Sequence, residues 1–65
     1  MNELIEQLDT MENAYRWVLR EFVLAEMDFW NSTGAPRALA VQRMKELLGR
    51  LQSIKREFAR LEEKL

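Results

Sequence analysis

The fold is decided by one stretch, Asn31-Ser32-Thr33-Gly34-Ala35-Pro36, the one cluster of turn-forming residues in a chain of 65. Glycine adopts the positive φ that ends a helix, and proline suits the first turn of the next, where its missing N–H costs nothing. We therefore predict a turn over 31–36, with Ser32 or Thr33 capping the following helix. One helix should occupy about 2–30, with Asn2 as its N-cap, and a second about 36–64.

Outward from this turn, apolar residues recur at alternating steps of three and four, which is the heptad seam of an α-helix. The first seam comprises Leu4, Leu8, Met11, Tyr15, Val18, Phe22, Ala25 and Phe29; the second comprises Ala40, Met44, Leu47, Leu51, Ile54, Phe58, Leu61 and Leu65. Folding the chain between positions 34 and 35 pairs each residue of one seam with a residue of the other, and the two numbers of every pair sum to 69. This symmetry predicts an all-α fold, an antiparallel two-helix hairpin that forms a single domain over 1–65.

The charges beside the seam favour the same register. With Leu8 at heptad position a, antiparallel helices bring position g opposite g and e opposite e. We expect three interhelical ion pairs of opposite sign: Asp28 with Arg43, Glu21 with Arg50, and Glu12 with Lys55. Each exposed pair stabilises by only a few tenths of a kcal/mol, so these contacts select the register more than they hold it.

The large apolar residues are more numerous than one seam can bury. The e side keeps Ile5, Leu19, Val41 and Leu48, and Val23 and Trp30 at position b widen it. Trp17, Leu24 and Met27 lie farther round, so the second half of helix 1 is apolar around most of its circumference. The residues that we predict to form a partner interface are Trp17, Leu19, Val23, Leu24, Met27, Trp30, Val41 and Leu48. The leading hypothesis is a homodimer, with two hairpins forming a four-helix bundle. The rival is a larger protein partner, for which the hairpin serves as an adaptor or chaperone subunit.

The two halves of the chain carry opposite charge. Residues 1–35 hold seven Asp or Glu against two Arg, a net −5, and residues 36–65 hold eight Lys or Arg against four Glu, a net +4. An acidic helix beside a basic one favours the hairpin over parallel pairing of like helices. The alternative function is nucleic-acid binding or regulation through the basic second helix, by Arg37, Arg43, Lys45, Arg50, Arg56 and Arg60. The acidic first helix opposes that alternative because it cancels the positive field nearby.

Nothing in the composition indicates an enzyme. The chain has no Cys and no His, which removes thiol chemistry, the commonest general base and the commonest metal ligand. Its acidic side chains read as a solvated, ion-paired face rather than as inward-facing ligands of a metal pair. We expect no cofactor and no bound metal, no membrane span and no secretory signal, and hence a cytoplasmic protein.

The opening residues carry a family resemblance. Met1-Asn2-Glu3-Leu4-Ile5-Glu6-Gln7-Leu8, followed by Glu12, resembles the start of the small co-chaperone subunits of type III secretion needle proteins, and the length and helix–turn–helix layout are also similar. That resemblance implies a hairpin that binds a larger helical-repeat chaperone, the two together keeping a needle subunit soluble in the bacterial cytoplasm. The turn with Pro36 and the two tryptophans are not features that match the family.

Overall fold

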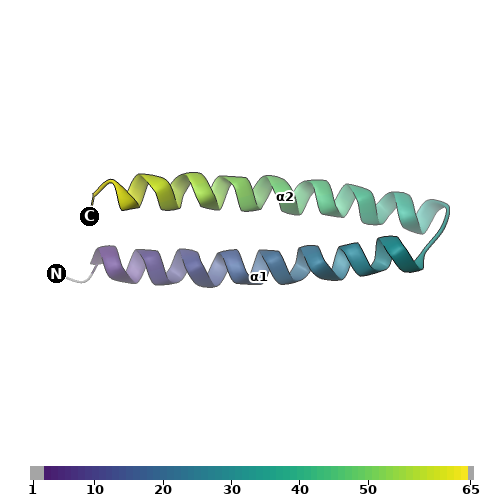
Figure 1. The fold of residues 1–65 in the computed structure, drawn as a ribbon, viewed down its shortest axis with the longest axis horizontal. Coiled ribbons are helices and arrows are strands. Elements are labelled where there is room, and N and C mark those ends of the chain that lie inside the picture. The colour runs from purple at the N-terminus through teal and green to yellow at the C-terminus, as the bar shows by residue number, and fades with distance from the viewer. Residues whose placement is uncertain (1–2, 65) are drawn as a thin grey trace.

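A computed structural model describes residues 3–64, which form two long helices that lie side by side and antiparallel (Figure 1). Helix α1 spans Glu3–Asn31 and helix α2 spans Ala35–Glu62. The start of α1 and the end of α2 lie at one end of the molecule, and the turn lies at the other. The Cα atoms extend over 51 × 15 × 11 Å, a flat rod one helix thick and two helices wide. The predicted all-α hairpin is therefore confirmed.

The seam between the helices is the core. Val18, Ala25, Leu47 and Leu51 form a buried cluster, and Tyr15, Phe22, Met44 and Ile54 pack against it. These eight residues are the members of four predicted pairs, from Tyr15 with Ile54 to Ala25 with Met44. Every seam residue among positions 3–64 is buried or half-buried, while Leu65 lies outside the described residues. The heptad spacing thus places one continuous stripe of each helix against the other.

The turn is shorter than the predicted stretch of 31–36. Asn31 closes α1, Ala35 opens α2, and Gly34 is the N-cap residue with φ 68° and ψ −138°. The Gly34 carbonyl accepts the first helical hydrogen bond, from the Ala38 N–H at 3.1 Å, and proline stands in the first turn as predicted.

The prediction that Ser32 or Thr33 caps α2 was wrong. No side chain makes a cap hydrogen bond at the start of this helix. A left-handed glycine at the cap satisfies the geometry of the turn with its backbone alone, which leaves the hydroxyl groups outside the capping position. The predicted N-cap of the first helix, Asn2, lies outside the described residues.

Substitution of Gly34 by alanine should destabilise the hairpin by about 1–3 kcal/mol. A Cβ at this position meets no other atom within 4 Å, so the cost arises from the backbone conformation, which side chains of L-residues rarely adopt. Thermal and urea denaturation followed by circular dichroism measures the loss.

The matched control for that experiment is Gly49→Ala. Gly49 lies within α2, outside the seam, and a Cβ there also meets nothing within 4 Å. Because alanine is the better helix former, this variant should gain about 1 kcal/mol. Equal effects of the two substitutions would contradict the assigned turn. A loss at Gly49 would instead indicate that another chain approaches the helix there.

Candidate protein interaction surface

The structure leaves most of the predicted interface residues in solvent. Seven are exposed, from Leu19 with 40% of its surface accessible to Trp30 with 73%. The other five of these are Trp17, Val23, Leu24, Met27 and Leu48. Val41, the eighth residue of the predicted set, is half-buried because it lies beside the seam of α2. Their role in an interface remains a prediction, but their exposure makes them available for one.

The exposed residues gather on the second half of α1. Leu19, Val23 and Leu24 line a shallow apolar groove whose other walls are Arg16 and Arg20. Long arginine side chains cover apolar surface with their methylene groups while the guanidinium stays in water. This part of the hairpin therefore offers apolar contact area at its centre and charge at its rim, as protein interfaces do.

Aromatic packing holds the end of the surface near the turn. The Arg37 guanidinium carbon lies 4.1 Å from the centre of the Phe29 ring, in cation–π geometry. Trp30 meets Phe29 edge to face, with ring centres 5.2 Å apart and planes at 81°. Phe29 is half-buried, so its contact with Trp30 links the exposed indole to the seam.

Two further large apolar residues are exposed, Ile5 and Leu39, with 56% and 66% of their surface accessible. Ile5 belongs to the predicted e side, whereas Leu39 was missed. Leu39 begins the run Leu39-Ala40-Val41, and Ala40 is the seam residue, so Leu39 must point away from Val41. It lines a hollow beside the turn together with Pro36, Asp28 and Arg43.

The predicted interhelical ion pairs are wrong in their partners. Arg43 Nη2 lies 3.7 Å from Glu21 Oε1, so Glu21 pairs with Arg43 rather than Arg50, and Asp28 is not the partner of Arg43. The prediction that Glu21 and Arg43 lie on the same side of the hairpin is confirmed, but the long arginine side chain reaches the carboxylate of the neighbouring heptad. Glu12 pairs along its own helix with Arg16 at 2.7 Å instead of crossing to Lys55. Side chains four residues apart are neighbours on the surface of a helix, so this i,i+4 pair forms locally.

An apolar groove runs along the e side of the hairpin, opposite the side that carries the Glu21–Arg43 ion pair. Tyr15, Ile54 and Phe58 form its floor, and Glu12, Lys55 and Glu62 form its rim. The groove lies next to the exposed Leu19 and Leu48, on the side toward the open end of the hairpin. Tyr15 comes before Leu19 on α1, and Ile54 and Phe58 come after Leu48 on α2.

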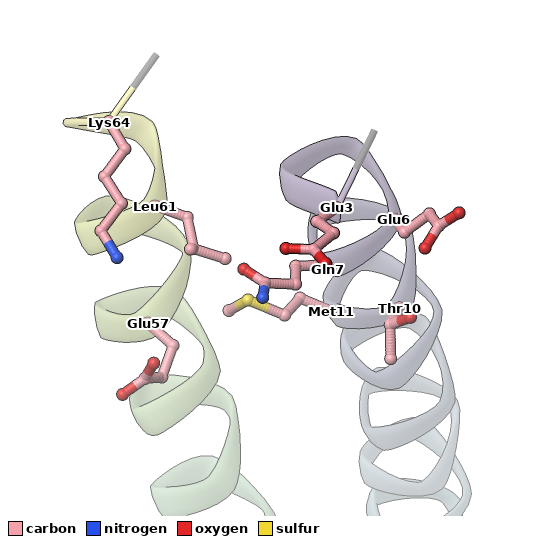
Figure 2. Close-up of a pocket in the computed structure, with 8 residues that line it drawn as sticks. All are labelled: Glu3, Glu6, Gln7, Thr10, Met11, Glu57, Leu61 and Lys64. Carbon is pink, nitrogen blue, oxygen red and sulfur yellow. The ribbon is translucent and has the colours of Figure 1, made fainter. Parts of the chain in front are cut away.

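A third, wider groove separates the helices at their open end (Figure 2). Met11 and Leu61 point toward each other between α1 and α2, whereas Glu6 and Thr10 point away from α2. The volume of this groove is about 600 Å³, and Glu3, Glu57 and Lys64 also line it. Met11 and Leu61 are half-buried here, whereas Leu47 is fully buried, so the seam is more open to solvent at this end.

The described residues 3–64 contain no group of three or more Asp, Glu, His or Cys placed to hold a metal ion. No buried side-chain nitrogen or oxygen in the same range lacks a hydrogen-bond partner. Neither α1 nor α2 has a stretch long and apolar enough to cross a membrane.

Comparison of the chain with known protein families, with curated proteins and with solved structures found no match.

Proposed function

We propose that this hairpin is a non-enzymatic protein–protein interaction module that buries its exposed apolar surface by association with a second copy, giving a four-helix bundle. The observation that carries the proposal is the imbalance between core and surface. Among the described residues, five hydrophobic side chains are buried and nine large ones are exposed. Monomeric proteins rarely display an apolar surface of this kind without a use for it.

The small size of the core supports the proposal. A chain below about 70–80 residues rarely obtains more than about 3–5 kcal/mol from its own core unless disulfides, a metal or association add to it. This chain has no cysteine, which removes disulfides. Burial of apolar surface contributes about 25 cal/mol per Å², so covering the flank of α1 would add to the stability of the hairpin.

The alternative within the same class is an adaptor or chaperone subunit that a larger protein covers. The resemblance of the opening residues to type III secretion co-chaperones favours this alternative, and the exposed Trp30 would then anchor a different protein. The two cases differ in the isolated chain, because an adaptor stays monomeric when its partner is missing.

Nucleic-acid binding through α2 is supported less well. Arg43 is within 4.0 Å of both Glu21 and Glu46, and Arg60 lies 3.0 Å from Glu57, so part of the predicted basic surface is already paired. Phosphate contacts would also make binding fall steeply with ionic strength, whereas hydrophobic association is nearly insensitive to salt.

The fluorescence of Trp30 tests the proposal directly. In a Trp17→Phe variant, Trp30 is the remaining tryptophan, and 73% of its surface is accessible in the single hairpin. Association should transfer the indole out of water, so its emission maximum should move to shorter wavelength as the chain concentration rises. An emission that stays at the wavelength of a solvated indole at every concentration would contradict the proposal.

A further inference from the structure

We infer that the two copies pack e flank to e flank about a twofold axis parallel to the helices, so that both turns lie at the same end of the bundle. The e flank is defined here as the surface made by heptad positions e and b of both helices. Its apolar members are Ile5, Leu19, Val23 and Trp30 on α1, and Val41 and Leu48 on α2. This inference rests on the proposed self-association and specifies its geometry.

The first step is the choice of flank. The hairpin has two broad faces, and one of them carries Glu21–Arg43, the only ion pair among residues 3–64 that joins the two helices. The other is the e flank, where the exposed Leu19, Val23, Trp30 and Leu48 lead into the groove floored by Tyr15, Ile54 and Phe58. Five of the nine exposed large apolar side chains of residues 3–64 lie on the e flank, whereas Trp17, Leu24, Met27 and Leu39 lie off it. The e flank is therefore the face that a second copy covers.

The flank is large enough for a stable dimer. The rod is 51 Å long, and two helices of about 10 Å diameter give a face of roughly 1,000 Å². A standard interface buries about 800 Å² on each partner. Full overlap of two e flanks therefore reaches the size of a specific interface, whereas an overlap of half the length does not.

The second step is the orientation, which the charges on the flank decide. Helix α1 contributes a net −2 from Asp9, Glu12, Arg16 and Glu26, and α2 contributes a net +1 from Lys45, Lys55 and Glu62. A twofold axis parallel to the helices sets α1 of one copy against α2 of the other. An axis perpendicular to them sets α1 against α1 and α2 against α2. The parallel axis thus brings unlike charges together and the perpendicular axis brings like charges together.

The position of the charges agrees with the parallel axis. Glu12 and Lys55 stand level with each other along the rod, and so do Leu19 and Leu48, because both pairs of numbers sum to 67. In the parallel arrangement each residue of α1 meets the α2 residue of its own level in the second copy. Among residues 3–64, no ion pair within the hairpin uses Lys45 or Lys55, so Lys55 of one copy can join the Glu12–Arg16 pair of the other.

The apolar residues favour the same orientation. Leu19, Val23, Trp30 and Leu48 all lie in the half of the rod next to the turn. A parallel axis lays this half on the same half of the second copy, and it sets the large Trp30 level with the small Ala38. A perpendicular axis with full overlap lays it on the open half instead, where the flank carries Asp9 and Glu12 beside Ile5. The parallel arrangement is the one that joins full overlap with contact between these four exposed apolar residues of the two copies.

Distances between spin labels test the orientation. The chain has no native cysteine, so Thr33→Cys in the turn and Gln7→Cys near the open end each give one label per copy. Both positions are exposed, and neither belongs to the e flank. With the turns at the same end, both label-to-label distances should stay below about 30 Å. With the turns at opposite ends, the rise of 1.5 Å per residue makes at least one of them reach about 40 Å.

The mass of each labelled variant is measured in the same samples. A dimer with two short distances supports the inference. A dimer with a long distance at either position overturns the parallel orientation and leaves self-association standing. A monomer overturns both, because no pair of labels then exists.

Discussion

Substitution of Leu47 by alanine should cost about 2–5 kcal/mol of unfolding free energy, the loss typical of a buried leucine. Leu47 is the one large side chain among the described residues with no accessible surface, and it lies at the centre of the seam opposite Phe22. Since a core this small supplies about 3–5 kcal/mol in all, the variant should be largely unfolded at low concentration. Urea denaturation followed by circular dichroism measures the loss, at one chain concentration because association adds to stability.

The control for Leu47→Ala is Leu39→Ala, the same chemical change on the same helix. Leu39 keeps 66% of its surface accessible, so its truncation should change the unfolding free energy by no more than about 0.5 kcal/mol. Similar losses at the two positions would show that Leu47 is not the centre of the core.

Substitution of Leu48 by aspartate should raise the dimer dissociation constant by more than about 100-fold while leaving the chain helical. The side chain has 47% of its surface accessible in the single hairpin and lies in the middle of the e flank. Association would bury a carboxylate there, and twofold symmetry places the change in the interface twice. In the orientation inferred above, each carboxylate also faces the acidic α1 of the other copy. Sedimentation equilibrium measures the constant, since each factor of ten corresponds to about 1.4 kcal/mol.

Leu39→Asp is the matched control for Leu48→Asp. Leu39 is also exposed on α2, but it lies nine residues before Leu48, which is about 180° round the helix and off the e flank. This variant should dimerise as the parent chain does. Dissociation by Leu39→Asp with retention of the dimer by Leu48→Asp would assign the interface to the other broad face, where Leu39 lies beside Asp28 and Arg43.

The sequence was sufficient for the architecture because the relevant signal repeats. Sixteen seam positions share one period and one point of reflection. A weak signal at single positions, such as the small Ala25 and Ala40, therefore does not change the prediction. Gly34 and Pro36 predict the same turn from their backbone conformations. In the structure Gly34 has a positive φ, and Pro36 lies in the first turn of α2.

The details that the sequence did not predict each depend on the conformation of a single residue rather than on a repeated pattern. Arg43 can reach more than one carboxylate, and its partner is Glu21 because side-chain length, not heptad letter, decides an exposed contact. Ser32 and Thr33 have the chemistry of a cap, yet the backbone of Gly34 takes that position. Leu39 gives no periodic signal, since one outward leucine beside the seam looks the same in sequence as an inward one.

The interface depends on contacts with a second molecule, and the sequence predicts it only through the surplus of apolar residues. The sequence predicted which residues exceed the needs of one seam, and Val41 apart, the structure shows them exposed. Exposure identifies a surface without identifying its occupant. Two observations favour a second copy as the occupant. The net charges of α1 and α2 are opposite in sign, and the e flank extends along the whole rod, so two copies can overlap over its full length.

Sedimentation equilibrium of the unmodified chain is the measurement that tests the central claim most directly, that the exposed flank is covered by another copy. One chain has a mass of 7.8 kDa, and at micromolar concentration the account predicts twice that value, nearly unchanged between low and high salt. A helical species that keeps the mass of one chain across the concentration range would contradict the account.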